Sequence, residues 1–283
     1  MRPFYILPVA LMAAAPAMAQ NLDLGGAPNA APVPIQITAT QGISWSQQAN
    51  TVTASGNAKA VRGDVTVTAD QLIAHYKPKK SGPQAKTDAN SLLTESGTQL
   101  TELDAVGHVH IYTATDNAWG DHAVYSTGQQ LLILTGKNLK LTTPKDTVTA
   151  RDSISYYVGD HKAIARGNAL ITTTDGRSVA ADVIIGYFAP QSDKNTDGSL
   201  KKVDALGHVV ITTPTDSASG DKAVYVPGTG EARLGGNVHI TRGENHLAGS
   251  DALVNMKSGT ATLLATPGGR VSGVILPNSG NAK

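Results

Sequence analysis

Two segments of this chain, LDAVGHVHIYTATDNAWGDHAVY (Leu103–Tyr125) and VDALGHVVITTPTDSASGDKAVY (Val203–Tyr225), are closely similar although they lie far apart. In each, apolar residues stand two and four places before a glycine and two and four places after it. Period two is the period of a β-strand, so these apolar side chains share one face. A polar turn, 115–117 or 215–217, then leads into a second apolar run. The segments therefore predict pairs of antiparallel strands with one apolar face.

The same glycine-centred pattern recurs along most of the chain, at Gly56, Gly107, Gly136, Gly167, Gly207 and Gly236. The unit is about 30 residues long, which is typical of a repeat protein. At Gly136 the following apolar residues shift by one place, which indicates a β-bulge. An aspartate follows each glycine in the second half of every unit, and we expect it to accept backbone N–H bonds at the turn. No stretch shows convincing helical periodicity, and the predicted class is all-β.

The N-terminus reads as an export signal. Arg2 is followed by an apolar stretch and by Ala17-Met18-Ala19, so we expect residues 1–19 to be a signal peptide cleaved after Ala19. A retained N-terminal anchor is the alternative. Loss of Arg2 from the 23 Lys and Arg residues leaves 22, which equals the 22 Asp and Glu residues. This balance gives no reason to expect a nucleic-acid partner, and the absence of cysteine means that the core alone stabilises the fold.

The rest of the chain divides by composition. Residues 20–34 are rich in Ala, Pro, Gly and Asn and predict a flexible leader. Residues 35–277 carry the β-repeats, interrupted by polar insertions at 77–98 and 189–199 that we interpret as surface loops. Residues 278–283 form a short tail. The lysines of the first insertion could contact phosphates, although a charged loop is more often simply solvated.

No catalytic or metal-binding motif is evident. The repeated aspartates and the scattered histidines lack the spacing of a catalytic or metal site, and no nucleophile elbow or phosphate loop occurs. His108, His110, His208 and His239 stand at odd offsets from a glycine, on the face opposite the apolar row. The sequence therefore predicts no enzyme, no cofactor and no metal.

The repeated apolar face has two possible uses. It can close on itself as a dry, filled core, or it can line a continuous groove. The inward set is rich in Ala, Val and Gly, which leaves room between sheets, and the units repeat along one axis. A groove of this kind suits acyl chains, since each exposed methylene costs about 0.8 kcal/mol.

Several segments resemble one known family. Ile35–Ala39, Gly42–Trp45, Asn50–Ala58, Val61–Val65 and Ala69–Tyr76 are similar to the opening of the OstA-like domain, and Arg270–Pro277 is similar to a common ending of that family. The chain thus resembles the LptA family of periplasmic lipopolysaccharide-transport proteins. The chain is longer than the commonest members, which we ascribe mainly to the two insertions and about one extra unit.

The resemblance implies a twisted β-jellyroll of consecutive antiparallel strands, open at both ends, that carries lipopolysaccharide with its lipid A acyl chains inside. It also implies partners: the inner-membrane transport complex, the jellyroll domain of the outer-membrane translocon, and further copies of the chain joined end to end. On this basis we expect twelve side chains to line the lipid path: Val109, Ile111, Leu132, Leu134, Leu139, Leu141, Ile171, Val209, Ile211, Leu234, Val238 and Ile240. We expect Ile35, Ile37, Val271, Val274 and Ile275 to form the terminal edges.

The main alternative is a structural or adhesive β-solenoid with a filled core and no lipid ligand. It would use the same repeat with parallel stacking. A secreted hydrolase is a third possibility, for which the sequence offers no assembled site.

Overall fold

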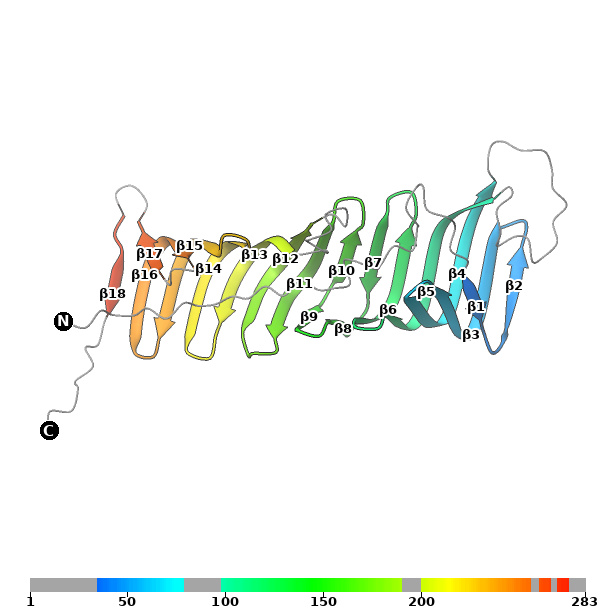
Figure 1. Cartoon of the computed structure of the whole chain (residues 1–283), viewed down its shortest axis with the longest axis horizontal. Coiled ribbons are helices and arrows are strands. Elements are labelled where there is room, and N and C mark those ends of the chain that lie inside the picture. The colour runs from blue at the N-terminus through cyan, green and yellow to red at the C-terminus, as the bar shows by residue number, and fades with distance from the viewer. Residues whose placement is uncertain (1–34, 79–97, 190–199, 256–259, 266–268, 275–283) are drawn as a thin grey trace.

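The computed structural model describes residues 35–78, 98–189, 200–255, 260–265 and 269–274. Every regular secondary-structure element in these ranges is a β-strand (Figure 1). In order they are β1 (Gln36–Thr38), β2 (Gly42–Ser46), β3 (Thr51–Arg62), β4 (Val65–Pro78), β5 (Thr98–Tyr112), β6 (Asn117–Ser126), β7 (Leu131–Thr135), β8 (Leu139–Thr142), β9 (Asp146–Ala150), β10 (Ser153–Tyr157), β11 (Lys162–Thr173), β12 (Ser178–Phe188), β13 (Leu200–Thr212), β14 (Asp216–Val226), β15 (Glu231–Arg242), β16 (Asn245–Asn255), β17 (Thr260–Leu264) and β18 (Ser272–Val274). None of the described segments is a helix that could span a membrane.

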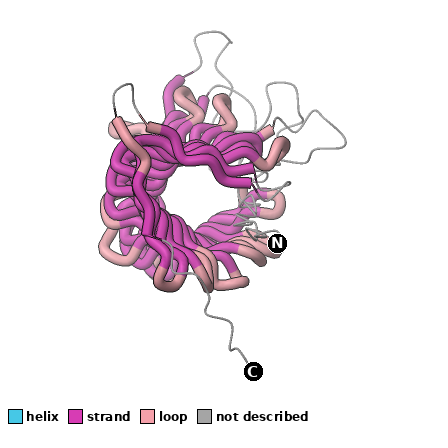
Figure 2. Tube along the Cα trace, turned by 90° about the vertical axis from the view of Figure 1, so that its left-hand side faces the viewer, coloured by secondary structure: helices cyan, strands magenta, loops and turns pink. Residues whose placement is uncertain are grey.

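The strands form one 18-stranded sheet in which the described pairings are antiparallel and mostly join neighbours in sequence. Four pairs of short strands act as single interrupted strands, because both members pair with the same neighbour: β1 and β2 with β3, β7 and β8 with β6, β9 and β10 with β11, and β17 and β18 with β16. The sheet coils around its long axis, so that strands encircle a common centre in the end-on view (Figure 2). The predicted antiparallel jellyroll is confirmed, and the parallel stacking of the alternative solenoid is not observed in the described strands.

A β-bulge interrupts five of the long strands at the repeat glycine. At Gly107 the φ angle is +77°, and at the following His108 it is +45°. Glycine adopts such angles without strain, while histidine is one of the few other residues that visits this region. The register of β5 against β6 shifts between Val106 and Val109 at this point. Gly-Asn or Gly-His bulges recur in β3, β11, β13 and β15, at 56–57, 167–168, 207–208 and 236–237.

The repeat aspartates belong to these bulges rather than to turns. A Cβ added to Gly107 would lie 2.1 Å from Oδ2 of Asp70 on the neighbouring β4. His108 Nδ1 also lies 2.8 Å from that oxygen, and the contact raises the pKa of this exposed histidine. At Gly136, which separates β7 from β8, the Lys137 backbone N–H donates to Asp121 Oδ2 over 2.8 Å. The predicted structural role of the aspartates is therefore seen, at a different place in the strand.

Several expected segments lie wholly or partly outside the described residues. They are the signal peptide 1–19, the leader 20–34, most of the insertion 77–98, residues 190–199 of the second insertion, and the tail 278–283. Of the first insertion, residues 77–78 belong to β4 and Thr98 to β5.

Candidate functional site

The interior of the tube is a continuous apolar surface built from alternate residues of each strand. In β13, Val209 is 0% exposed, while its neighbour Val210 is 39% exposed. The bulge preserves this alternation: Ala205 before it and Val209 after it are both buried. Alternation across the bulge thus gives the whole strand one inward face.

All twelve side chains predicted to line the path belong to this interior. Nine of them are buried core residues: Val109, Ile111, Leu132, Leu134, Leu139, Val209, Ile211, Leu234 and Val238. The other three, Leu141, Ile171 and Ile240, are partly buried and pack against the core. Contact of these side chains with a lipid remains a prediction.

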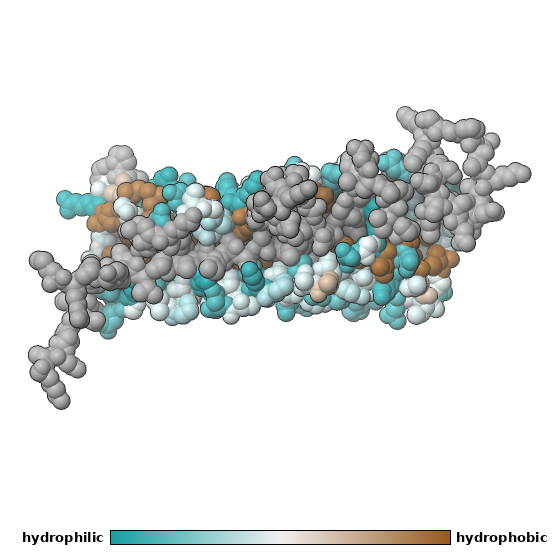
Figure 3. Space-filling view, viewed as in Figure 1, coloured by the Kyte–Doolittle hydropathy of each residue, from teal (hydrophilic) through white to brown (hydrophobic). Residues whose placement is uncertain are grey.

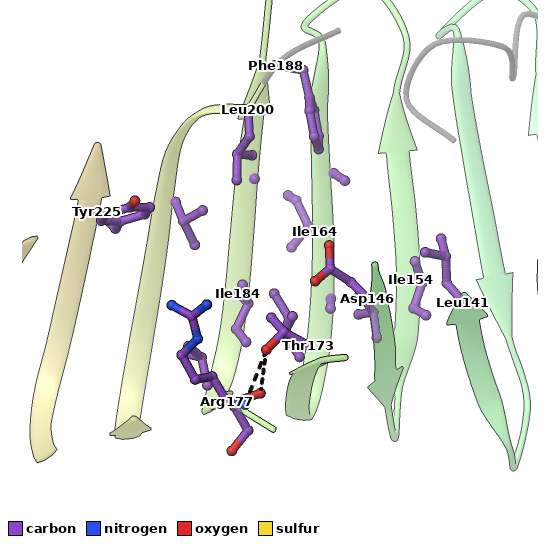
Figure 4. A pocket seen from close by; sticks show the side chains of 18 residues that line it. Leu141, Asp146, Ile154, Ile164, Thr173, Arg177, Ile184, Phe188, Leu200 and Tyr225 are labelled. Atoms are coloured by element: carbon purple, nitrogen blue, oxygen red, sulfur yellow. Dashed lines mark hydrogen bonds between the residues drawn. The ribbon is translucent and has the colours of Figure 1, made fainter. Parts of the chain in front are cut away.

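A cavity of about 100 Å³ opens off the interior near the middle of the chain (Figure 4). Its walls come from strands between β8 and β14, and they are almost entirely apolar. Leu141, Ile154, Ile171, Ile184 and Phe188 are among the side chains that line it. This cavity is smaller than the usual small-molecule pocket of about 300–1,000 Å³, so a long chain would enter it only with some separation of the two walls.

Two ionisable side chains face the same cavity. Asp146, at the start of β9, is 3% exposed, and burial raises the pKa of its carboxyl from 3.8 to about 6, against a smaller opposite effect of Lys145. Arg177 lies in the turn before β12 and hydrogen-bonds Asp175 through Nη2, while its Nη1 is buried without a hydrogen-bond partner among the described residues. Figure 4 shows both side chains reaching into the space between the strands.

Tyrosines occupy the inner face near the strand ends that lie away from Asp146 and Arg177. Tyr125 is 1% exposed and lies between Leu103 and Leu132 in the sheet register. Tyr156 and Tyr225 have equivalent places in β10 and β14, and burial raises the pKa of Tyr225. The interior thus has an apolar middle, aromatic side chains at one border and charged groups at the other.

Both ends of the sheet have an edge. At the first end, Ile37 in β1 and the preceding Ile35 are partly buried against the core. At the other, Val271 and Val274 are 44% and 60% exposed. Ile275 lies outside the described residues. Their role in assembly remains a prediction.

Two apolar residues at the β2 end of the tube, which we call its mouth, were not among the interior or edge residues predicted from the sequence. Ile43 and Trp45 in β2 are 54% and 40% exposed, yet they pair with Ala54 and Val52 on the inner face of β3. Directly paired residues of antiparallel strands project to the same face, so these two side chains face inward and are exposed because no further strand covers them. Apolar patches are also visible towards both ends in Figure 3. The alternation Ile43-Ser44-Trp45 is the sequence signal that could have identified them.

One polar cluster also went unpredicted, on the outer face of β4 and β5. A ring nitrogen of His75 and a carboxylate oxygen from each of Glu102 and Asp104 lie within 4.8 Å of one another. His75 Nε2 is 3.1 Å from Asp104 Oδ2. At the corresponding place in β13, Lys202 Nζ lies 2.9 Å from Asp204 Oδ2 of the same strand. The second pair is thus an ion pair within one strand, whereas the first cluster joins two neighbouring strands.

These features define a class: an elongated all-β jellyroll of antiparallel strands with an apolar interior and exposed apolar residues at its ends. The chain belongs to the family described as LptA/(LptD N-terminal domain) LPS transport protein, which matches residues 36–159 and again residues 152–260. The family model thus matches two consecutive ranges that overlap at residues 152–159, and we refer to these ranges as the two copies of the family domain.

Several solved structures are similar to part of the chain. One of them is LptH of Pseudomonas aeruginosa, described as the LptA homologous periplasmic component of the conserved lipopolysaccharide transport device. The identity is 17% and the TM-score 0.39, over 47% of this chain and 95% of that one. No match was found among curated proteins.

Proposed function

We propose that this chain is a non-enzymatic periplasmic carrier that conducts lipopolysaccharide from the inner to the outer membrane along its apolar interior. The observation that carries this proposal is the single inward apolar face, which runs from Ile43 and Trp45 at one mouth, through the central cavity, to β15 and β16. An acyl chain that moves through water needs such an unbroken track, since exposing four methylenes costs about 3 kcal/mol. Family membership favours lipopolysaccharide as the cargo.

The same proposal includes assembly at the two ends. β2 pairs with β3 and β18 with β16, and the two strands lie at opposite ends of the sheet (Figure 1). An edge strand offers unpaired backbone groups to another sheet. We infer end-to-end pairing with further copies of this chain and with the jellyroll domains of the inner-membrane complex and the outer-membrane translocon. Exposed apolar residues beside these edges support the inference, because pairing would cover them.

Site-specific photo-crosslinking tests the proposed lipid path. A photoreactive residue would replace Val209 in one variant and Val210 in another, in cells that make lipopolysaccharide. These neighbours differ in direction, with Val209 inside and Val210 outside, so each controls for the other. A lipopolysaccharide adduct at Val209 alone is the expected result. Equal adducts at both positions, or none at either, would count against an interior path and in favour of a filled core.

A further inference from the structure

The carboxyl of Asp146 is a polar group held inside an apolar cavity by the geometry of its turn. The Asp146 backbone N–H donates to Thr143 Oγ1 over 3.0 Å, and the Thr143 N–H donates to the Asp146 carbonyl over 2.9 Å. These bonds involve the backbone of Asp146 and leave its carboxyl free to point inward (Figure 4). Within the described residues, neither carboxyl oxygen has a hydrogen-bond partner.

Two other turns have the same backbone hydrogen bonds as the turn that ends at Asp146. Neither of them places an unpartnered carboxyl at the cavity, so the turn itself does not require one there. In Thr213–Asp216 the backbone bonds are the same, but the Asp216 carboxylate accepts bonds of 2.5 and 2.9 Å from Arg242. In Thr113–Asp116 the carboxyl is also buried and unpartnered, but it does not line the central cavity. Of these three aspartates, Asp146 alone offers free acceptor oxygens to the cavity.

A buried carboxyl without a partner is costly, and a ligand that supplies a hydrogen-bond donor removes that cost. The surrounding wall defines the rest of the ligand. Val148, Ile154 and Ile171 line the same space and favour an apolar chain. Once its walls separate, the cavity therefore suits a hydrocarbon chain that carries a hydroxyl or an amide N–H.

We propose that Asp146 determines which chains the interior prefers, by accepting a hydrogen bond from a hydroxyl or amide N–H on the apolar chain of the bound amphiphile. This inference rests on the proposed lipid-carrying function and adds a specificity-determining residue to it. The carboxyl makes this contact part-way along the tube, where Asp146 is 3% exposed and a single hydrogen bond discriminates strongly.

The test compares chains that differ by one hydroxyl. Octadecanoic acid, 3-hydroxyoctadecanoic acid and 12-hydroxyoctadecanoic acid would compete for the full mature chain with a fluorescent fatty acid. We expect the better of the two hydroxy acids to bind about tenfold more tightly than octadecanoic acid, the ratio that one net hydrogen bond supplies. In Asp146→Leu this preference should disappear while octadecanoic acid still binds.

Asp116→Leu is the matched control, because it removes a buried, unpartnered carboxyl from the same kind of turn away from the cavity. It should retain the preference. Circular dichroism would verify folding, and Asp146→Asn, which keeps an acceptor oxygen, should retain part of the preference if the leucine variant does not fold. Equal binding of all three acids to the wild-type chain, or a preference that survives Asp146→Leu, would overturn the role of Asp146 and leave the carrier function standing. Failure of the wild-type chain to bind any of the acids would overturn both.

Discussion

Inward and outward side chains alternate along β11, and the difference between two neighbours gives a test at the residue scale. Ile171 lines the central cavity, while Leu170 is 36% exposed on the outer face. A charge at Ile171 would lie in the apolar path and would lose its hydration whenever a chain occupies the cavity, which costs several kcal/mol.

Ile171→Glu is therefore expected to lower the amount of lipopolysaccharide that copurifies with the chain by about tenfold or more. Leu170→Glu places the same charge outside and should leave loading unchanged. Quantification of bound lipid by mass spectrometry would distinguish the two variants. Normal loading of a folded Ile171→Glu chain would exclude this side chain from the lipid path.

Asp146 gives a prediction on stability and pH. Its pKa rises from 3.8 to about 6 in the folded chain because burial disfavours the charged form. Between these values the folded state binds more protons than the unfolded state, so the stability supplied by this group is present below about pH 4 and declines as the pH rises to about 6.

Replacement by Asn removes this titration. At pH 7.5 we expect Asp146→Asn to be more stable than the wild type, by at most about 3 kcal/mol. At pH 4 the two chains should be nearly equal. Denaturant unfolding at both pH values measures the difference, and a variant less stable than the wild type at pH 7.5 would show that the carboxylate has a favourable partner.

At the scale of the element, the glycine bulge is the device that bends five of the long strands, β13 among them. Gly207 has a φ of +76°, and a Cβ there would lie 2.1 Å from Asp182 Oδ2 on β12. Alanine at this position therefore meets both an unfavourable backbone angle and a clash. Because the clash involves a side chain that also bonds His208, its displacement would break a second contact.

We expect Gly207→Ala to lower the free energy of unfolding by about 2 kcal/mol or more. Gly228→Ala is a suitable control, because an added Cβ there would meet nothing within 4 Å and the glycine has no positive φ. Urea denaturation of both variants would measure the effect. Equal stabilities would mean that the bulge tolerates a side chain and that its glycine has another role.

At the scale of the whole molecule, the two copies of the family domain share one sheet and one interior. β10 (Ser153–Tyr157), in the overlap of the two matched ranges, pairs with β7 and β11 and continues the sheet from one copy to the next. In the proposed bridge, joints between molecules would form at the outer ends, near β2 and β18.

The mouth residues test such a joint. Trp45→Lys puts a charge on the inner face of β2, where a second sheet would cover it, and we expect concentration-dependent assembly to weaken by about tenfold. Ser44→Lys places the same charge on the outer face of this strand and should assemble like the wild type. Sedimentation velocity over a range of concentrations would show the difference. Unchanged assembly of Trp45→Lys would exclude this end from the joint.

The sequence by itself determined the features that depend on near neighbours in the chain. Alternation placed all twelve predicted interior side chains on the inner face. The one-residue shift after Gly136 indicated a β-bulge, whereas the structure has a break between β7 and β8 there, after which Leu139 is still buried. Polar turns between apolar runs indicated antiparallel strands. These inferences succeed because the direction of a side chain on a strand follows from a local period of two.

Only the tertiary structure decided which strands bring particular side chains together. Asp70 contacts the bulge at Gly107 on the next strand, not the glycine of its own repeat unit, and His75 meets Asp104 across a long connection. The opening of Asp146 onto a cavity, while Asp216 has a partner in Arg242, likewise depends on neighbouring strands. Such contacts are set by register and by the lengths of connections and bulges, which local sequence patterns do not fix.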